Sequence, residues 1–512
     1  MSDRLPLRPQ HVPPQPLRGI VELLGLTGAP APEIVVTGIT HDSRQVRPGD
    51  VYAALPGART HGAVFAGQAA EAGAVAVLTD PTGTGAISGL PVLVVDDPRA
   101  RLGGVAAAIY GDPARELLML GITGTNGKTT TSYLVESGLQ TAGHVPGLVG
   151  TIETRVGTDR FASSRTTPEA TDLHALLAVM LERGVTACVM EVSSHGLALG
   201  RVDGIVFDVA GFTNLSQDHL DFHADIEDYF AAKAALFTPQ HSRHGVVMVD
   251  DEYGHRLAAS AAVPITSVST RQEADWRVVG VEPADSGSSV AVVEKRSGAR
   301  VRVRSPIPGE FNVANTALAF VMLDQAGVDR SAAARGIGAC PGVPGRMERV
   351  SGPGTGGPLA VVDYAHTPDA IGNVLQALRP STRGRLVVVL GAGGDRDRRK
   401  RPQMGAAAAR YADHVVVTDD NPRSEDPAAI RAAVLDGARA AAAGRQVEVV
   451  EVPDRRAAIW RAVDLAPESA DTVAVMGKGH EKGQEAAGVV YPFDDRVVLR
   501  EALGSLQAKA SS

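Results

Sequence analysis

The stretch LLMLGITGTNGKTTTSYLVESGL, residues 117–139, decides the fold class. An apolar run typical of a buried β-strand leads into a glycine-rich loop, and a helical segment follows. The glycines let backbone N–H groups turn toward phosphate oxygens, and the N-terminus of the helix adds a favourable dipole. Lys128 supplies positive charge for terminal phosphates, and Thr129 supplies a hydroxyl for Mg²⁺. The stretch therefore predicts a strand–loop–helix unit that binds nucleotide phosphates.

This loop departs from the strict G-x-x-x-x-G-K-[ST] pattern, because Ile122 stands where that pattern has its first glycine. A purely structural glycine turn is therefore the alternative interpretation. The apolar run before the loop and the helical segment after it favour phosphate binding over that alternative.

The composition narrows the class of protein. A chain of 512 residues is too long for one hydrophobic core, and it predicts two to four domains. With a net charge of −8, no basic block and only 4% aromatic residues, nucleic-acid binding is not expected. No apolar stretch approaches the roughly 18–20 residues that span a bilayer. Cys188 and Cys340 have no metal-binding spacing and are expected as small buried side chains, which favours a reducing, cytoplasmic compartment.

Short apolar runs alternate with helical stretches along most of the chain, which predicts parallel α/β sheets. We expect a flexible, proline-rich N-terminal arm at residues 1–20 and three domains, at residues 21–113, 114–340 and 341–512. A Pro/Gly-rich hinge at residues 339–358 separates the last two domains. Ligands of such sheets bind at the carboxyl ends of the strands.

A series of further motifs accompanies the phosphate loop in a fixed order. They are HDSR (41–44), TTPE (166–169), EVSSHGL (191–197), NLSQDHLDFH (214–223), DYFAAKAALF (228–237), FNVAN (311–315), GRME (345–348), DYAHTPD (363–369), GGDRDRRKRP (393–402), DNPR (420–423) and GKGHE (477–481). Together with TGTNGKTT they cover most of residues 40–500. In this order and combination the chain resembles the Mur ligase family.

The resemblance implies a fold and an activity. The expected fold is α/β, with an N-terminal UDP-binding α/β domain, a central P-loop ATPase-like parallel-sheet domain and a C-terminal Rossmann-like domain. The expected activity is ATP-dependent addition of meso-diaminopimelate to UDP-N-acetylmuramoyl-L-alanyl-D-glutamate through an acyl phosphate, in peptidoglycan precursor synthesis. The implied partners are these small molecules and ATP, with no nucleic acid, no membrane insertion and a monomeric state.

The resemblance also implies the catalytic and nucleotide-binding residues. Catalysis would rest on Lys128, Glu191, His219, Lys233 and Arg346. Thr129 and Glu191 would hold one Mg²⁺, and His219 with a carbamylated Lys233 (N6-carboxylysine) would hold a second near the acyl phosphate. ATP would meet Gly124, Thr125, Asn126, Gly127, Lys128, Thr129 and Thr130 at its phosphates and Asn312 and Asp363 at its nucleoside.

Two of these residues have simpler interpretations. A histidine such as His219 is often structural, and the surrounding DHLDFH favours a ligand. A lysine such as Lys233 in an alanine-rich helix is usually a solvated surface group. Carbamylation needs a neutral amine, and therefore a pKa lowered by a shielded or cationic setting.

The muramoyl-dipeptide would contact Ser43, at the UDP end, and Thr166, Thr167, Ser193 and Arg201. Relatives usually read HGLxQxR, whereas this chain has HGLALGR with Leu199 at the glutamine position. The departure removes one substrate hydrogen bond, worth roughly 0.5–1.5 kcal/mol if nothing replaces it.

Diaminopimelate has a distal end that carries both an ammonium and a carboxylate. By resemblance, its pocket would contain Arg401, Asp420, Asn421, Pro422, Arg423, Gly477 and Glu481. Arg423 would clasp the distal carboxylate with two hydrogen bonds, with Arg401 as the second candidate. Asp420 and Glu481 would accept from the ammonium. A solvated loop is the alternative interpretation of DNPR.

Two other functions compete with this one. The same phosphate loop suits a phosphoryl-transfer enzyme or a nucleotide-gated binding protein. A family relative with another acceptor, such as a folate-polyglutamate or D-Ala-D-Ala-adding ligase, is the third hypothesis, and the HDSR and DNPR motifs argue against it.

Overall fold

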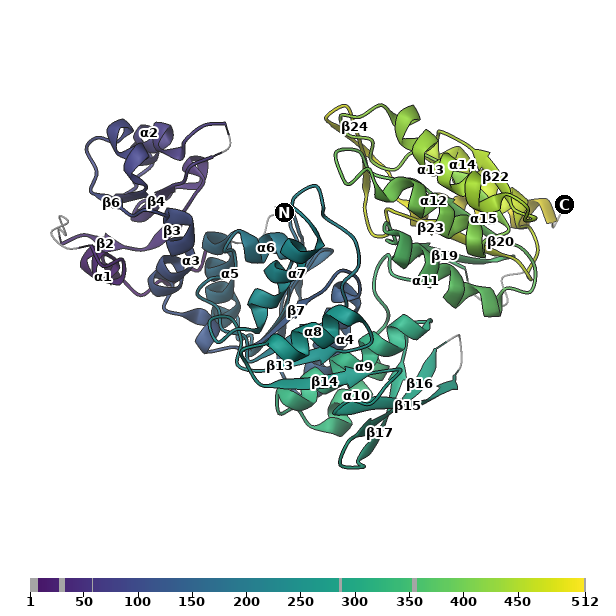
Figure 1. The fold of residues 1–512 in the computed structure, drawn as a ribbon. Coiled ribbons are helices and arrows are strands. Elements are labelled where there is room, and N and C mark those ends of the chain that lie inside the picture. The colour runs from purple at the N-terminus through teal and green to yellow at the C-terminus, as the bar shows by residue number, and fades with distance from the viewer. Residues whose placement is uncertain (1–7, 27–32, 58, 285–287, 352–356, 511–512) are drawn as a thin grey trace.

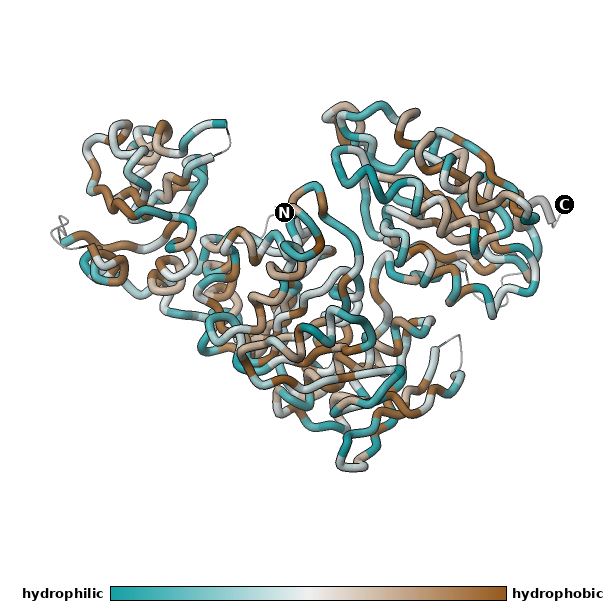
Figure 2. Tube along the Cα trace, in the orientation of Figure 1, coloured by the Kyte–Doolittle hydropathy of each residue, from teal (hydrophilic) through white to brown (hydrophobic). Residues whose placement is uncertain are grey.

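A computed structural model describes residues 8–26, 33–57, 59–284, 288–351 and 357–510. The chain forms three α/β domains in sequence order, coloured purple, teal and green to yellow in Figure 1. Apolar residues concentrate along the strands, while polar residues dominate the loops (Figure 2). The predicted fold class, three α/β domains with parallel sheets, is confirmed.

The N-terminal domain is built on a four-stranded parallel sheet in the order β3-β4-β5-β6. The domain also holds a small antiparallel pair, β1 with β2. Its elements are β1 (Gln15–Pro16), α1 (Leu17–Leu23), β2 (Val35–Val36), β3 (Gly38–Thr40), β4 (Asp50–Ala54), α2 (Ala66–Glu71), β5 (Ala76–Thr79), β6 (Val92–Val94) and α3 (Pro98–Ile109).

The expectation of a flexible arm is wrong for residues 8–20, while residues 1–7 lie outside the described part. Arg8 forms a two-bond ion pair with the buried Asp50, at 2.7 and 3.0 Å. Leu17 and Ile20 are buried in the core of the domain. The prolines suggested flexibility, but the apolar residues Leu17 and Ile20 that follow them are buried in the core and hold the segment in place.

The central domain contains an eleven-stranded sheet in the order β10-β9-β8-β11-β7-β12-β13-β14-β15-β16-β17. The strands are β7 (Leu118–Thr123), β8 (Pro146–Val149), β9 (Glu153–Val156), β10 (Asp159–Ala162), β11 (Ala187–Glu191), β12 (Val209–Phe212), β13 (Gly245–Met248), β14 (Ile265–Ser269), β15 (Trp276–Pro283), β16 (Ser289–Lys295) and β17 (Arg300–Ser305). The helices are α4 (Lys128–Thr141), α5 (Ala170–Glu182), α6 (Ser194–Ala198), α7 (Ile226–Ala234), α8 (Glu252–Ser260), α9 (Glu310–Gln325) and α10 (Arg330–Gly338).

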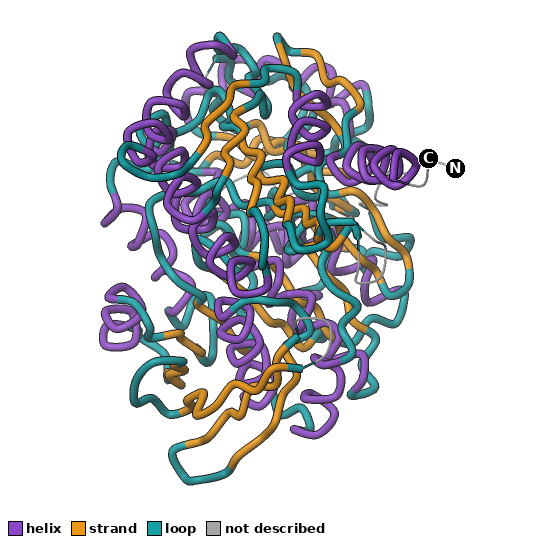
Figure 3. The backbone as a smooth tube through the Cα atoms, turned by 90° about the vertical axis from the view of Figure 1, so that its right-hand side faces the viewer, coloured by secondary structure: helices purple, strands orange, loops and turns teal. Residues whose placement is uncertain are grey.

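The sheet is parallel from β8 to β15 and antiparallel at both ends. Residues of α4, α9 and α10 belong to one hydrophobic core, and residues of α5, α7 and α8 belong to another. The helices therefore cover both faces of the strands (Figure 3). This burial explains why the predicted strands at β7, β11, β12 and β13 are almost continuously apolar.

The C-terminal domain has a six-stranded sheet in the order β18-β19-β23-β20-β21-β22, parallel except at β18. A separate hairpin pairs β24 with β25. The elements are β18 (Glu348–Arg349), β19 (Leu359–Asp363), α11 (Pro368–Leu378), β20 (Leu386–Leu390), α12 (Lys400–Tyr411), β21 (His414–Val417), α13 (Pro427–Ala442), β22 (Glu448–Glu451), α14 (Arg455–Leu465), β23 (Thr472–Met476), β24 (Gly483–Ala486), β25 (Val489–Pro492) and α15 (Asp495–Ala510).

The predicted hinge begins at the end of the central domain, and its residues 352–356 lie outside the described part. Both cysteines are free and buried, and burial raises the pKa of the Cys188 thiol to about 12. Within the described ranges, no helix has the length and apolarity needed to cross a bilayer.

Candidate active site

The phosphate loop connects β7 to α4 at the carboxyl end of the central sheet. Gly124 and Gly127 have φ values of 138° and 92°, which only glycine adopts without strain. The loop is supported by the neighbouring segment after β12: Thr213 donates to the carbonyl of Asn126 at 2.6 Å, and Asn214 accepts from its amide at 3.0 Å. These contacts hold the backbone in the turn that phosphate binding requires.

Two lysines converge on this loop. The Nζ atoms of Lys128 and Lys233 donate to the same Gly124 carbonyl, at 2.7 and 2.8 Å. Lys233 is 1% exposed, and its Nζ lies 4.5 Å from the centre of the Tyr229 ring. Burial, with Lys128 nearby, lowers the pKa of Lys233 well below its usual value. The interpretation of Lys233 as a solvated surface group is therefore wrong, because α7 turns this side chain toward the phosphate loop.

A buried carboxylate lies beside the first turn of α4. Thr129 donates to Glu191 at 2.9 Å, and the amide and hydroxyl of Thr151 donate to the same carboxylate at 2.9 Å each. Glu191 is fully buried at the end of β11. The predicted pair Thr129 and Glu191 is thus in direct contact.

The oxygen donors of Thr129 and Glu191 fit Mg²⁺, which binds proteins through one or two carboxylates together with substrate phosphates. Accordingly, no cluster of three or more His, Cys, Asp or Glu side chains suited to a metal occurs among the described residues. Burial lowers the pKa of His219 to about 3, so its imidazole is neutral, the form that binds metals. An unmodified Lys233 cannot be a ligand as an ammonium, and the site fits the metal there only with a carbamate.

Arg346 reaches the phosphate loop from the start of the C-terminal domain. Its Nη2 donates to the Thr129 hydroxyl at 3.3 Å, and its guanidinium stacks on the Tyr364 ring at 4.3 Å. The Asp363 carboxylate accepts from the amides of Met347 and Ala365, both at 2.7 Å. Asp363 therefore fixes the backbone that carries Arg346, a role that the sequence did not reveal.

Asn312, the other expected nucleoside contact, lies in the first turn of α9. Its Nδ2 donates to the Pro308 carbonyl at 2.7 Å, and its Oδ1 accepts from Asn315 at 3.1 Å. Asn315 also lies against Gly127 of the phosphate loop, where its Oδ1 would be 2.4 Å from an added Cβ. Asn315 therefore links Asn312 to the phosphate loop.

A buried ion pair joins the central and C-terminal domains. Lys400, at the start of α12, donates to Asp218 at 3.0 Å, and both side chains are less than 10% exposed. Burial opposes ionisation of Asp218, but His366, His219 and Lys400 together hold its pKa well below the usual value. This cluster brings DYAHTPD and GGDRDRRKRP next to the loop that carries His219.

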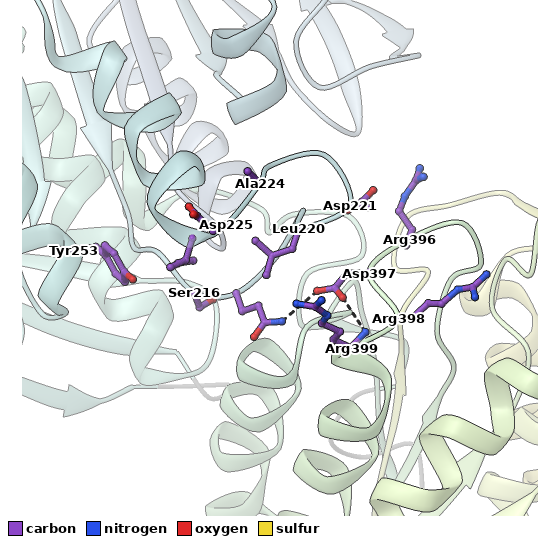
Figure 4. A pocket seen from close by; sticks show the side chains of 12 residues that line it. Ser216, Leu220, Asp221, Ala224, Asp225, Tyr253, Arg396, Asp397, Arg398 and Arg399 are labelled. Carbon is purple, nitrogen blue, oxygen red and sulfur yellow. Dashed lines mark hydrogen bonds between the residues drawn. The ribbon is translucent and has the colours of Figure 1, made fainter. Parts of the chain in front are cut away.

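Beside this ion pair lies an interdomain pocket of about 730 Å³ (Figure 4). The loop between β12 and α7 lines one side and residues 396–399 line the other. Gln217 donates to Asp397 across the pocket at 3.3 Å. The pocket therefore lies where relative movement of the two domains would open or close it.

Four predicted dipeptide contacts lie together near Glu191. The hydroxyls of Thr167 and Ser193 are 3.0 Å apart, and Arg201 donates to the Thr167 carbonyl at 3.2 Å. Thr166 contacts Thr151, the residue that also binds Glu191. A further residue, Glu169, pairs with Arg201 at 2.8 Å and belongs to the quoted TTPE motif.

Ser43 lies apart from this group, in the N-terminal domain, where it donates to Gln68 at 3.0 Å. Its motif is nevertheless linked to the central domain, because His41 contacts Thr171 of α5 at 3.0 Å. Leu199, at the usual glutamine position, is the C-cap of α6.

The predicted diaminopimelate residues lie where β21 and β23 end. Asn421 donates to Glu481 at 2.9 Å and accepts from Lys478 at 2.9 Å. An added Cβ at Gly477, where φ is 112°, would be 2.4 Å from the Asp420 carboxylate. Pro422 lies in the same loop, its carbonyl against Gly394. The sequence missed Lys478, which is fully buried and pairs with Glu481 at 2.7 Å.

The two candidate arginines differ in their contacts. Arg401 is 5% exposed and forms two hydrogen bonds with Glu425, at 2.8 and 3.1 Å. Arg423 is 22% exposed, donates to the Gly394 carbonyl at 2.7 Å and pairs with Glu485 at 3.3 Å. Arg401 is therefore held by the protein itself, whereas Arg423 remains accessible. The sequence did not predict that the segments carrying the partners of these two arginines would lie next to them.

Comparison with known proteins identifies the family of the chain. Three family models match the chain in order: Mur ligase family, catalytic domain, at residues 35–110; Mur ligase middle domain at residues 122–323; and Mur ligase, glutamate ligase domain, at residues 345–479. Together they match more than half of the 512 residues.

A relative from Streptomyces avermitilis, UDP-N-acetylmuramoyl-L-alanyl-D-glutamate--2,6-diaminopimelate ligase, is 60% identical over 98% of this chain and 99% of its own length. A solved structure of a ligase with the same name is 33% identical, covers 95% of this chain and 98% of its own, and has a TM-score of 0.67. The D-alanyl-D-alanyl ligase from Acinetobacter baumannii, UDP-N-acetylmuramoylalanyl-D-glutamyl-2,6-diaminopimelate--D-alanyl-D-alanyl ligase, is 18% identical over 97% of this chain and 99% of its own. Its TM-score is 0.62, a likeness of fold alone.

Proposed function

Because the chain belongs to the Mur ligase family, we propose from its site and its relatives that it adds meso-diaminopimelate to UDP-N-acetylmuramoyl-L-alanyl-D-glutamate. The reaction consumes ATP and extends the peptide of a peptidoglycan precursor. Full-length relatives from two Streptomyces species, 60% and 58% identical, carry the name of this activity.

Amide formation from a free carboxylate is unfavourable in water, because hydroxide is a poor leaving group. Transfer of the γ-phosphoryl group of ATP to the carboxylate gives an acyl phosphate, which an amine displaces with release of phosphate. Two anions must therefore meet, and cations must offset their repulsion. The convergence of Lys128 and Arg346 on one loop supplies that positive charge.

At the phosphate loop, backbone amides of residues 124–130 would cradle the phosphates of ATP. Lys128 leaves the Gly124 carbonyl to neutralise the terminal phosphates, and Arg346 approaches them from the C-terminal domain. Asn312 and Asp363 would lie at the nucleoside end of ATP. Asp363 would act there through the backbone amides of Met347 and Ala365, which its carboxylate holds in place.

Thr129 and Glu191, and His219 with carbamylated Lys233, would hold Mg²⁺. When bound, Mg²⁺ would lower the repulsion between the phosphate and the attacking carboxylate. Burial supports the carbamate, because it favours the neutral amine that reacts with CO₂. A Lys233→Ala variant should lose turnover and regain part of it with short carboxylic acids. The intact mass of the unchanged protein should show the added carboxylate on Lys233. Full activity of an unmodified lysine contradicts the carbamate.

The amino acid binds at the ends of β21 and β23. Arg423 receives the distal carboxylate, while Asp420 and Glu481 accept from the distal ammonium. Arg401 positions the 393–394 backbone through its bond to Gly393, at 3.1 Å, rather than contacting substrate. Lysine is disfavoured because it has no distal carboxylate to form two parallel hydrogen bonds with Arg423.

The observation that carries the proposal is the Arg346–Thr129 contact, which completes the phosphate site from another domain. The purified protein, given ATP and UDP-MurNAc-dipeptide, should form one amide and one phosphate per diaminopimelate, and far less product with lysine or D-Ala-D-Ala. A phosphorylated product without an amide would point to a phosphoryl-transfer enzyme. We also propose that the protein is cytoplasmic and monomeric. Light scattering of the purified protein tests the monomeric state.

A further inference from the structure

We propose that Glu485 is an internal carboxylate that occupies Arg423 until the distal carboxylate of the amino acid displaces it, and that it thereby sets the affinity for that amino acid. The proposal deepens the function given above and rests on it. Glu485 belongs to β24, at the end of the C-terminal domain where Figure 1 labels that strand.

The backbone places Glu485 beside Arg423 independently of the ion pair. The amide of Arg423 donates to the Glu485 carbonyl at 3.1 Å, and the amide of Ala487 donates to the Arg423 carbonyl at 2.7 Å. The amide of Glu485 donates to Asn421 at 2.9 Å. The side chain can therefore leave Arg423 without disturbing the strand that carries it.

The backbone of Arg423 is itself held in an unfavourable conformation, with φ of 52°. A non-glycine residue in the left-handed region stores strain of order 1 kcal/mol and persists only where its surroundings enforce it. The two backbone bonds around Glu485 provide that enforcement. The guanidinium of Arg423 then lies between the Gly394 carbonyl and the Glu485 carboxylate.

The geometry of the guanidinium decides which edge a substrate can use. Nη1 of Arg423 already donates to the Gly394 carbonyl at 2.7 Å. The edge formed by Nε and Nη2 is the one that offers a carboxylate two parallel donors free of the Gly394 contact. Glu485 Oε2 lies 3.3 Å from Nε, at one end of that edge. The substrate cannot form both bonds until Glu485 moves away.

Comparison with the neighbouring pair shows which carboxylate can move. Glu425 is 11% exposed and binds Arg401 through two hydrogen bonds, with Arg398 also within 3.1 Å. Glu485 is 40% exposed and makes one contact with Arg423. A half-exposed, single-contact ion pair contributes only about 0.2–1 kcal/mol. Glu485 is therefore displaceable, and Glu425 is a fixed part of the pocket wall.

The pair also affects how tightly the distal carboxylate binds. Without substrate, Glu485 neutralises Arg423, so an amino acid that lacks a distal carboxylate gains nothing by entering and leaves the pair intact. Diaminopimelate can replace the internal carboxylate with its own. Glu485 thus lowers the affinity for diaminopimelate modestly while it holds the Arg423 side chain in place.

The test is steady-state kinetics of the full-length ligase and its Glu485→Gln variant, with diaminopimelate and lysine as competing acceptors. The variant should lower KM for diaminopimelate about 1.4-fold to fivefold, the range that 0.2–1 kcal/mol predicts, with kcat unchanged. The kcat/KM for lysine should stay the same, and the gain should shrink in 1 M salt. Glu485→Asp, which keeps the charge, should behave closer to the wild type.

A Glu282→Gln variant is the matched control. Glu282 pairs with Arg302 on the surface of the central domain, with both side chains more than half exposed, and its loss should leave all constants unchanged. An unchanged or higher KM for diaminopimelate in Glu485→Gln, or an equal gain with lysine, overturns the proposal. A higher KM would assign Glu485 to the substrate ammonium instead. If the wild type couples no diaminopimelate at all, the proposed function fails first and separately.

Discussion

Arg455 and Asp495 form a fully buried ion pair beneath the amino-acid pocket, and breaking it should destabilise the C-terminal domain strongly. Nε and Nη2 of Arg455 donate to the two oxygens of Asp495, both at 2.8 Å, and neither side chain is exposed. The same guanidinium donates to the carbonyl of Met476 at 2.8 Å, one residue before Gly477. The pair therefore connects the starts of α14 and α15 to the end of β23.

The Asp495→Asn change keeps the shape of the side chain but removes the closest counter-ion of the buried Arg455, leaving Asp420 at 3.9 Å as its nearest carboxylate. Removing one partner of such a pair costs about 3–5 kcal/mol. With a urea m-value on the order of 2 kcal/mol/M for a domain of this size, the unfolding midpoint should fall by about 1.5–2.5 M. Replacing both residues together, as Arg455→Met with Asp495→Leu, should cost less than the sum of the single changes.

Trp460 lies on α14 with Arg455 and reports on this domain, whereas Trp276 is buried in the central sheet. Urea unfolding followed by fluorescence, with Trp276→Phe in every protein compared, isolates the C-terminal transition. A midpoint that moves by less than about 0.3 M in Asp495→Asn would refute the assignment of a strong buried pair. KM for diaminopimelate should also rise in this variant, because the end of β23 loosens.

Three further changes have defined outcomes. Gly124→Ala places a Cβ 1.8 Å from the Thr213 hydroxyl at φ of 138°, so ATP turnover should be lost, while Gly104→Ala, in α3 with no atom within 4 Å of the added Cβ, should leave turnover unchanged. Lys400→Met leaves the buried interdomain carboxylate without its closest cation, so kcat/KM should fall about tenfold or more, and X-ray scattering should show a more open molecule. Burial, with Arg346 and Arg496 nearby, lowers the pKa of His480 to about 3, against about 6.5 unfolded. The unfolded state therefore binds more protons between these values, and stability falls as pH drops below 6.5. The His480→Gln variant should not lose the stability that the wild type loses through His480 on acidification. The free energy of unfolding of the variant relative to the wild type should therefore rise by about 2 kcal/mol between pH 7 and pH 4.5. A parallel pH dependence in the two proteins would contradict the assignment.

Local sequence predicted the parts of the site whose chemistry lies within a few residues. The loop at residues 124–129 needs glycines at 124 and 127 for its positive φ values, and the lysine and threonine that follow define its ligand. The strands at β7, β11, β20 and β23 were recognisable because burial on both faces demands continuous apolar runs. The resemblance of ordered motifs then predicted the family that the comparisons confirm.

Contacts between distant segments were beyond that reasoning. Arg401 and Arg423 look alike in sequence, yet Glu425 holds the first with two buried bonds and Glu485 holds the second with one exposed contact. Lys400 pairs with Asp218, 182 positions earlier in the chain. The antiparallel strands β15–β17 and the packing of residues 8–20 were also missed, because weakly patterned segments take their structure from what they pack against.

The sequence by itself determined the fold class, the nucleotide loop and the reaction chemistry, since backbone preferences and functional groups are properties of short segments. The tertiary structure alone decided which charges are paired, which lysine is buried and which arginine remains accessible at the surface. Pairing depends on distance and burial between segments far apart in the chain, and only the packing of the folded domains sets those.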